Sequence, residues 1–297
     1  MSKKMQGNIM LLITAMIWGS AFVAQSKGMD YIGPFTFNVC RNFLGAIVLL
    51  PVIALFNRGK KYQPEEKKAL DKNTLIGGIC CGVVLFIASS FQQYGLVHTT
   101  AGKAGFITAL YIVIVPLLGL FMGRKVPKII WGCVALAIAG FWLLCIKEGF
   151  TVGLGDLMVL ICAFFYSMHI VTIDRFSPKA DGVKMSCIQF FAAGILSLLP
   201  MLLWETPHMP SILDAKWTIL YAGVLSSGVA YTFQIIAQKH TEPTVATLLM
   251  SLESVFAALF GWIILHEQMA GKELFGCLLV FIAVILAQIP IPVKQKK

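Results

Sequence analysis

Ten apolar runs, each about 20 residues long, constrain the fold of this chain more than any other feature. A run of this length spans the hydrocarbon core of a bilayer, and only 13% of the residues are charged, against about 25% in a soluble domain. Backbone that crosses a membrane forms helices or a closed barrel, and the alternation of barrel strands is absent. The sequence therefore predicts an all-α integral membrane protein with ten transmembrane helices. The runs lie at 7–26, 35–56, 74–97, 104–123, 127–146, 153–173, 183–204, 217–238, 244–265 and 272–290.

The basic residues predict how the helices are oriented. With the N-terminus inside, the segments on the cytoplasmic side hold 18 Lys and Arg residues and those on the other side hold 5. Basic residues concentrate on the cytoplasmic side of membrane proteins. The only long connection, 57–73, then lies in the cytoplasm. The net charge of +10 is explained by this bias rather than by nucleic acid. We expect a multi-pass protein of the cell (plasma or inner) membrane with both termini in the cytoplasm.

An internal repeat divides the chain into two halves. Residues 88–119 align with 230–261 at a constant offset of 142, and ten of 32 positions are identical. The repeat unit then contains five helices. Because five is odd, the second copy enters the membrane from the opposite side, which makes the repeat inverted. Inverted repeats are common in secondary transporters, whose substrate site lies near the membrane midplane between the halves. We expect the halves at residues 1–148 and 152–297.

Five stretches in order also resemble a known family. They are "AMIWGSAFV", "RNFLGAIVLLP", "GFITALYIVIVPLLGLFMGRK", "GDLMVLICAFFYSMHIVTIDR" and "SLESVFAALFGWIILHEQ". Together they resemble the ten-helix EamA-type family of the drug/metabolite transporter superfamily, over nearly the whole chain. That family usually has a proline after the mid-helix glutamate of its ninth helix, where this chain has Ser254; Pro116 is present in the fourth helix. The resemblance implies a carrier for small metabolites, commonly one that exports amino acids or related compounds.

Two charged residues lie inside the predicted membrane spans. Glu253 lies in the middle of the ninth apolar run and Arg41 lies inside the second. An ionised group at the bilayer centre costs about 2.5–3.5 kcal/mol on insertion scales, so such residues usually face a cavity or a partner. Their predicted heights differ by roughly 7 Å, which two long side chains can bridge. They form either an ion pair that stabilises the fold or charges that line the substrate route.

Polar residues form matching stripes on two other faces. On the second helix, the spacing i, i+3, i+4, i+7 is occupied by Asn38, Arg41, Asn42 and Gly45. On the eighth helix, a similar stripe contains Ser227, Tyr231, Gln234 and Gln238. The repeat places Gln92 opposite Gln234 and Tyr111 opposite Glu253. Polar stripes on membrane helices either join helices or line a cavity.

The recurrence of these stripes in both halves favours a cavity. Trp18 and Tyr166 occupy similar places in the first and sixth helices, and packing and stacking on a ligand are both open to them. His169 is expected to be a hydrogen-bonded core residue. The predicted substrate-binding residues are Glu253, Arg41, Asn38, Asn42, Gln92, Tyr111, Tyr231, Gln234 and Trp18.

These features favour a secondary transporter that works by alternating access. One Arg and one Glu suit an amino acid or a related zwitterion; a multidrug exporter of hydrophobic cations is the alternative. A channel or a sensor is the alternative of another class. An enzyme is not expected, because no P-loop, GxGxxG, HExxH or catalytic cluster is present, and the eight cysteines include no CxxC. We expect no cofactor and no metal. The expected partners are a small-molecule substrate and the lipid bilayer, with a coupling proton left open and the oligomeric state unspecified.

Overall fold

The computed structural model is a bundle of helices. It describes residues 2–57, 64–99, 101–124, 126–145, 153–265 and 271–288, and these residues include no strand. Eight helical stretches are long and apolar enough to cross a membrane, and two shorter apolar helices cover Lys128–Gly140 and Leu274–Ala283. The predicted boundary between the halves, near 148–152, and the basic residues at 294–297 lie outside the described residues.

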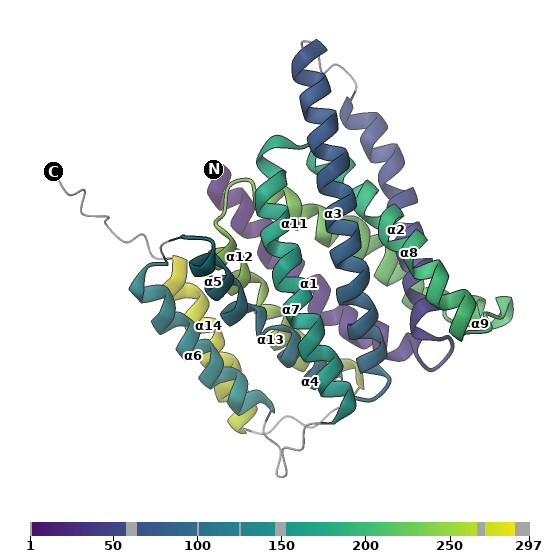
Figure 1. Ribbon diagram of the computed structural model, residues 1–297. Helices are drawn as coiled ribbons and strands as arrows, with labels where there is room; N and C mark the ends of the chain where they lie inside the picture. The colour runs from purple at the N-terminus through teal and green to yellow at the C-terminus, as the bar shows by residue number, and fades with distance from the viewer. Residues whose placement is uncertain are drawn as a thin grey trace.

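The described helices follow one another in the order of the apolar runs (Figure 1). The N-terminal part contains α1 (Lys3–Gly28), α2 (Pro34–Asn57), α3 (Pro64–Leu96), α4 (Ala101–Thr108), α5 (Tyr111–Phe121) and α6 (Lys128–Cys145). The C-terminal part contains α7 (Leu154–Phe176), the 3₁₀ turn η1 (Ser177–Lys179), α8 (Gly182–Trp204), α9 (Met209–Asp214), α10 (Lys216–Leu220), the π-helix η2 (Tyr221–Tyr231), α11 (Thr232–Ala237), α12 (Pro243–Met250), α13 (Leu252–Leu265) and α14 (Gly271–Gln288).

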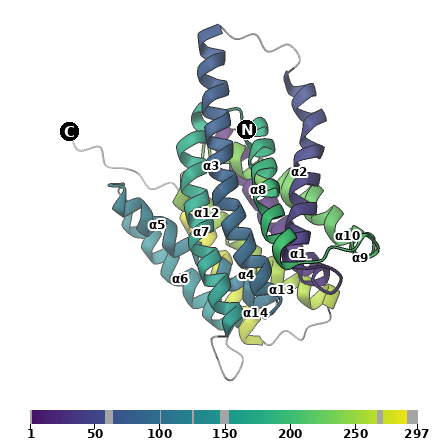
Figure 2. The ribbon, with the colours of Figure 1, turned by 45° about the vertical axis from the view of Figure 1, so that its right-hand side comes forward.

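Helix α3 begins ten residues earlier than the apolar run at 74–97 predicts. Pro64 is its first residue, and Glu65 and Glu66 lie in its first turn. Proline is favoured at the first helical position, and acidic side chains there interact favourably with the helix dipole. Part of the connection at 57–73 is therefore helical, and α3 projects beyond the rest of the bundle (Figures 1 and 2).

Two of the predicted spans are interrupted at equivalent places. The fourth run is divided between α4, which ends at Thr108, and α5, which begins at Tyr111. The ninth run is divided between α12, which ends at Met250, and α13, which begins at Leu252. Thr108 and Met250 differ by the repeat offset of 142. Each predicted half therefore contains one apolar span that is broken at the same register.

Hydroxyl side chains accompany the interruption before α13, and Ser254, in the first turn of α13, stands where the resemblance implies a proline. Thr247 Oγ1 donates to the Thr244 carbonyl at 2.8 Å, and Ser251 Oγ donates to the Leu248 carbonyl at 2.8 Å. Ser254 N–H then bonds the Ser251 carbonyl, three residues back, at 3.2 Å. Hydroxyls that bond to carbonyls in the preceding turn bend helices. The helix is thus interrupted without a proline.

The eighth predicted span contains a long π-helix. Its 11 residues, Tyr221–Tyr231, connect α10 to α11. Side chains of α1 bond to its carbonyls: Thr14 Oγ1 donates to Ala230 O at 3.1 Å and Trp18 Nε1 donates to Ser226 O at 3.5 Å. π-Helical segments are rare and are found mostly at functional sites. This one places Tyr231 in the interior, 5% exposed.

Helices from the two parts of the chain pack against each other throughout the bundle. α1 contacts α13 and η2, α2 contacts α8, α3 contacts α7 and α8, and α6 contacts α14. α6 and α14 form a pair at one side (Figure 1). The α1–α13 contact is close because Gly19 has no side chain: a Cβ there would lie 2.7 Å from the Glu253 carbonyl. The six cysteines whose side chains are described are free and lie in helices.

Polar contacts connect the ends of helices that the predicted topology places on the cytoplasmic side. Thr241, before α12, donates to Asn8 Oδ1 in α1 at 3.3 Å. Lys184, in the first turn of α8, lies 3.5 Å from Asp71 Oδ1, near the start of α3. All of these residues belong to segments with the same predicted side.

A second set of contacts connects the ends predicted to face outward. Thr99 Oγ1, after α3, donates to Asp156 Oδ1 in the first turn of α7 at 2.8 Å. Glu205, after α8, accepts from the N–H groups of Phe35 and Thr36 in α2 at 2.8 and 2.7 Å. Each of these contacts therefore joins two helix ends that the topology predicts to lie on the same side of the membrane.

Candidate functional site

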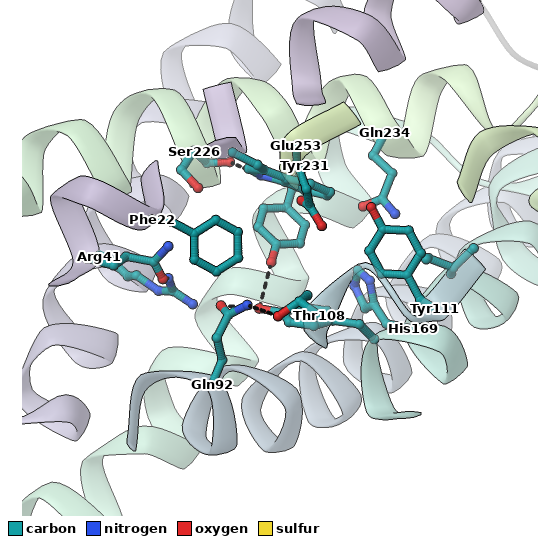
Figure 3. Close-up of a pocket in the computed structure, with 14 residues that line it drawn as sticks. Phe22, Arg41, Gln92, Thr108, Tyr111, His169, Ser226, Tyr231, Gln234 and Glu253 are labelled. Carbon is teal, nitrogen blue, oxygen red and sulfur yellow. Dashed lines mark hydrogen bonds between the residues drawn. The ribbon is translucent and has the colours of Figure 1, made fainter. Parts of the chain in front are cut away.

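A cavity lies inside the bundle where α1, α2, α3, α4, α5, α7, η2, α11 and α13 meet (Figure 3). It offers about 30 Å³ to the centres of water molecules, and one buried water needs about 10–15 Å³ by this measure. The cavity thus holds a few waters, and a metabolite requires its walls to move apart. Seven of the nine predicted residues line it: Trp18, Arg41, Gln92, Tyr111, Tyr231, Gln234 and Glu253.

Asn38 and Asn42 do not line this cavity. Both are buried in α2, 0% and 1% exposed, and Asn38 Nδ2 donates to the Ser89 carbonyl in α3 at 3.2 Å. They share the stripe with Arg41 but do not reach the cavity. Asn38 joins α2 to α3, and the substrate-binding role predicted for both stays a prediction.

Arg41 reaches the cavity from α2 and is 3% exposed. Its Nη1 donates to Gln25 Oε1 in α1 at 2.6 Å, while its Nε has no partner. The backbone carbonyl of Gln25 also accepts from Gln93 Nε2, at 3.3 Å. Gln25 therefore holds the guanidinium of Arg41 in place. The Nε–H group of Arg41 is left to donate to another group.

Glu253 reaches the cavity from the first turn of α13 and is 2% exposed. The N-terminal end of a helix favours a negative charge. The Tyr111 side chain, at the first position of α5, lines the same cavity. Neither its hydroxyl nor Glu253 Oε1 has a hydrogen-bond partner of normal geometry. The residues that the repeat equates thus face the same space.

The structure describes both Arg41 and Glu253, and no ion pair joins their side chains. Each is almost fully buried, and each keeps an unpartnered polar atom. Burying a charged group without a partner is costly, so a protein keeps one only where the arrangement has a use. Of the two alternatives from the sequence, the fixed pair is absent in this structure. The two opposite charges line one cavity separately.

A chain of hydrogen bonds crosses the cavity wall between the two parts of the protein. Gln92 Nε2 in α3 donates to Thr108 Oγ1 at the end of α4, at 3.2 Å. Its Oε1 accepts from the Tyr166 hydroxyl of α7 at 3.1 Å, and the Tyr231 hydroxyl donates to the Tyr166 oxygen at 3.2 Å. Gln92 thus connects an interrupted helix of the first half to two aromatic residues of the second.

Aromatic rings form the apolar part of the lining. The rings of Trp18 and Tyr231 are 4.6 Å apart between centroids, and Phe22 lies one turn beyond Trp18 on α1. The His169 ring contacts Tyr231 edge-on at 5.8 Å. Aromatic faces attract cations as well as apolar groups. The cavity therefore combines opposite charges with a wall suited to an organic body.

Several lining residues were not predicted as site residues. They are Phe22, Gln25, Thr108, Tyr166, His169, Ile170 and Ser226. His169 was expected to be a core residue, whereas Tyr166 was left open between packing and stacking on a ligand; both are buried and hydrogen-bonded. A signal for Gln25 was present, because it is the last polar residue on the face of α1 that carries Trp18 and Phe22. Thr108 is the residue before the helix interruption, which the sequence did not reveal.

The profile of the EamA-like transporter family matches residues 5–146 and 153–288. The chain belongs to this family. An EamA-like transporter is a multi-pass membrane protein, which agrees with the eight apolar spans. The prediction of an all-helical membrane protein is therefore confirmed, whereas the number of ten helices and the inverted repeat stay predictions.

Curated EamA-like relatives cover nearly the whole chain. An "Uncharacterized transporter" of Archaeoglobus fulgidus is 30% identical over 288 residues, which is 97% of this chain and 87% of the relative. An "S-adenosylmethionine/S-adenosylhomocysteine transporter" of Chlamydia muridarum is 22% identical, over 92% of this chain and 90% of its own. One crystal structure superposes with a TM-score of 0.72 at 19% identity, covering 94% of this chain and 95% of that one, which shows a shared fold. The two relatives from Archaeoglobus fulgidus and Chlamydia muridarum are named as transporters.

Proposed function

We propose that this protein is a secondary transporter that carries an amino acid or a related zwitterion across the cell membrane by alternating access. The observation behind the proposal is that Arg41 and Glu253 line one buried cavity without pairing. A zwitterion supplies a carboxylate for the guanidinium and an ammonium for the carboxylate. Charge-assisted hydrogen bonds of this kind are the strong ones. The substrate therefore offsets the cost of two buried charges.

The lining also limits the substrate class. A phosphorylated substrate carries two or more negative charges and requires several basic side chains, whereas Arg41 is the one Lys or Arg among the described lining residues. S-adenosylmethionine, which the name of the Chlamydia relatives includes, contains an amino-acid zwitterion and an organic body. At 22% identity the name does not transfer, but the compound belongs in the first panel tested.

The fold assigned in this proposal has ten transmembrane helices in two inverted halves. The equivalent interruptions of α4–α5 and α12–α13 support it, because transporters with inverted repeats build their sites from broken helices. The two sets of polar contacts at the helix ends support alternate crossing, since each set joins segments of one predicted side. Both termini then lie in the cytoplasm.

Alternating access explains why the cavity is smaller than a metabolite, because the site of such a carrier changes size between states. The cavity has room for only a few waters, so a substrate enters it only when the helices around the site move apart. The Gln92–Tyr166 hydrogen bond joins the halves in this structure, and the Tyr166–Tyr231 bond continues it within the second half. Substrate enters when these contacts open toward one side of the membrane. A proton on Glu253 in place of the substrate's ammonium would allow the empty carrier to return.

Transport into proteoliposomes tests the proposal. The full-length protein is reconstituted and assayed for uptake of radiolabelled amino acids and S-adenosylmethionine. Glu253→Gln keeps the size but removes the charge, and we expect at least a tenfold loss of transport, the effect of one lost charge-assisted hydrogen bond. Glu242→Gln, at an exposed carboxylate before α12, is the matched control. We expect uptake by the wild-type protein to saturate and to depend on pH. We expect uptake by Glu253→Gln to show neither saturation nor pH dependence.

Either of two results would refute the proposal. The first is an unsaturable flux, which indicates a channel. The second is a Glu253→Gln protein that is unstable but transports normally at a permissive temperature, which indicates a structural role for the carboxylate.

Efflux of hydrophobic cations is the second candidate, favoured by the Trp18–Tyr231 wall beside Glu253. Arg41 in the same cavity opposes it, because a guanidinium repels a cation. Uptake of tetraphenylphosphonium that competes with no amino acid would favour this candidate.

A further inference from the structure

Three unpartnered acceptor atoms line the part of the cavity around Glu253. They are Glu253 Oε1 in α13, Gln234 Oε1 in α11 and His169 Nδ1 in α7. Their side chains are 2%, 1% and 0% exposed, so water outside the protein does not satisfy them. Buried polar atoms are nearly always hydrogen-bonded, and each exception requires an explanation. Two more unpartnered atoms line the cavity, Arg41 Nε, which is a donor, and the Tyr111 hydroxyl, which can donate, so the three atoms that can only accept call for a common cause.

His169 is an acceptor because of its second nitrogen. Nε2 lies 3.0 Å from Gln189 Oε1 in α8, and an amide oxygen can only accept, so Nε2 carries the hydrogen. A neutral imidazole with a hydrogen on Nε2 has a lone pair on Nδ1. Tyr231 fixes the ring by an edge-on contact, with centroids 5.8 Å apart. No ion pair joins His169 to a carboxylate among the described residues. The imidazole thus presents one fixed acceptor.

We propose that these three atoms form a binding site for a primary ammonium group, –NH₃⁺. Such a group has three N–H donors, and the site has three acceptors from three different helices, one of them charged. The inference rests on the proposed function and deepens it, because it names the chemistry of the substrate's nitrogen. Figure 3 shows Glu253, Gln234 and His169 with Tyr111 at the end of the cavity away from Arg41.

The number of donors sets the selectivity. A trimethylated nitrogen has the same charge but no N–H, so it leaves Gln234 and His169 unpartnered and keeps only the attraction of Glu253. Leaving buried acceptors unpaired is the strongest way in which a site rejects an analogue. Aromatic cages select in the opposite direction, for quaternary ammonium groups. Ethanolamine and choline, which share a body and differ only at nitrogen, therefore separate the two kinds of site.

The first experiment measures thermal unfolding of the full-length protein in detergent with increasing ethanolamine or choline, because a ligand that binds the folded state stabilises it. We expect ethanolamine to raise the unfolding temperature at millimolar concentration with an apparent affinity at least tenfold tighter than that of choline. Equal affinities, tighter choline binding, or no shift with either compound would overturn the inference.

The second experiment removes the neutral acceptors one at a time. Gln234→Leu and His169→Phe are each expected to weaken ethanolamine binding about tenfold, the loss of one charge-assisted hydrogen bond. His169→Asn, whose amide oxygen can occupy the place of Nδ1, is expected to retain binding. The matched control is Gln238→Leu, one turn beyond Gln234: this amide is buried, bonds the Ile170 carbonyl and does not line the cavity. A Gln238→Leu loss as large as that of Gln234→Leu would contradict the assignment.

The outcomes separate this inference from the proposed function. Ethanolamine has no carboxylate and does not require Arg41. Selective ethanolamine binding without any amino-acid transport would refute the function and leave the ammonium site standing. Transport of amino acids together with equal transport of their N-trimethyl derivatives would refute the ammonium site and leave the function standing.

Discussion

Glu205 connects the two parts of the protein at the end predicted to face outward, and its removal is a sharp test of the structure. Helix α2 begins with Pro34, and the residue before it, Gly33, has no side chain to cap the first turn. Glu205, which follows α8, supplies that cap from a distance. Its carboxylate accepts from the N–H groups of Phe35 and Thr36 at 2.8 and 2.7 Å, and from the Thr36 hydroxyl at 2.6 Å.

The size of the effect follows from these contacts. Losing a local N-cap side chain costs about 0.5–2 kcal/mol. An anion near a helix N-terminus contributes roughly 0.3–1 kcal/mol more. Glu205 satisfies two N–H groups and a hydroxyl while partly buried, so we expect Glu205→Ala to lower the free energy of unfolding by about 2–3 kcal/mol. Glu205→Gln retains one acceptor oxygen and is expected to cost about half as much.

The assay is unfolding of the purified protein in mixed micelles, followed by tryptophan fluorescence. Glu242→Ala is the control, because Glu242 also lies at the start of a helix, α12, but its side chain makes no capping hydrogen bond. We expect this substitution to change the free energy of unfolding by no more than about 0.5 kcal/mol. Gly33→Ala gives an independent test: a Cβ there would lie 2.6 Å from Glu205 Oε1 and displace the carboxylate. Combined with Glu205→Ala, it should add little. A Glu205→Ala protein as stable as the wild type would refute the tertiary cap.

Two further predictions concern topology and the packing around the site. Reporter fusions after Lys68 should report the cytoplasm and fusions after Asp214 the outside, and a cytoplasmic signal at Asp214 would contradict the ten-helix topology. Gly19→Ala should lower stability by about 1–3 kcal/mol and reduce transport, because its Cβ would press on the Glu253 backbone, where α1 and α13 touch. Gly102→Ala, where a Cβ meets no atom within 4 Å, should change neither, and equal effects of the two substitutions would contradict this reading of the helix contact.

The spans and the two intramembrane charges were readable from the sequence because their signals are local. An apolar run of about 20 residues indicates a membrane-spanning helix. An ionisable residue inside such a run is rare enough to indicate a functional site. Arg41 and Glu253 were found in this way, and both line the cavity. The polar stripe on α2 was less informative, because the spacing of residues shows which face of a helix they share but not how far each side chain extends. Arg41 extends into the cavity from it, whereas Asn38 stops at the Ser89 carbonyl.

The remaining features depend on packing that no local pattern encodes. The π-helix of η2 receives hydrogen bonds from Thr14 and Trp18, more than 200 residues earlier in the chain. Gln25 gains its role only because Arg41 folds against it. His169 was expected in the core, and it is buried, but its free nitrogen becomes evident only when Gln189 of α8 occupies the other one. Such residues acquire a function from their neighbours and not from their own position in a helix.

The interrupted helices explain why Glu253 stands where it does. The repeat places α5 and α13 at equivalent positions, so both present the start of a half-helix to the same cavity. A half-helix N-terminus favours an acceptor or an anion at either position. The first half places the Tyr111 hydroxyl there and the second half a carboxylate. Two carboxylates would repel each other, whereas a phenol can donate to the single one. Under the proposed function, one negative charge then remains to balance the substrate's ammonium, and Arg41, which the first half alone contributes, remains for its carboxylate.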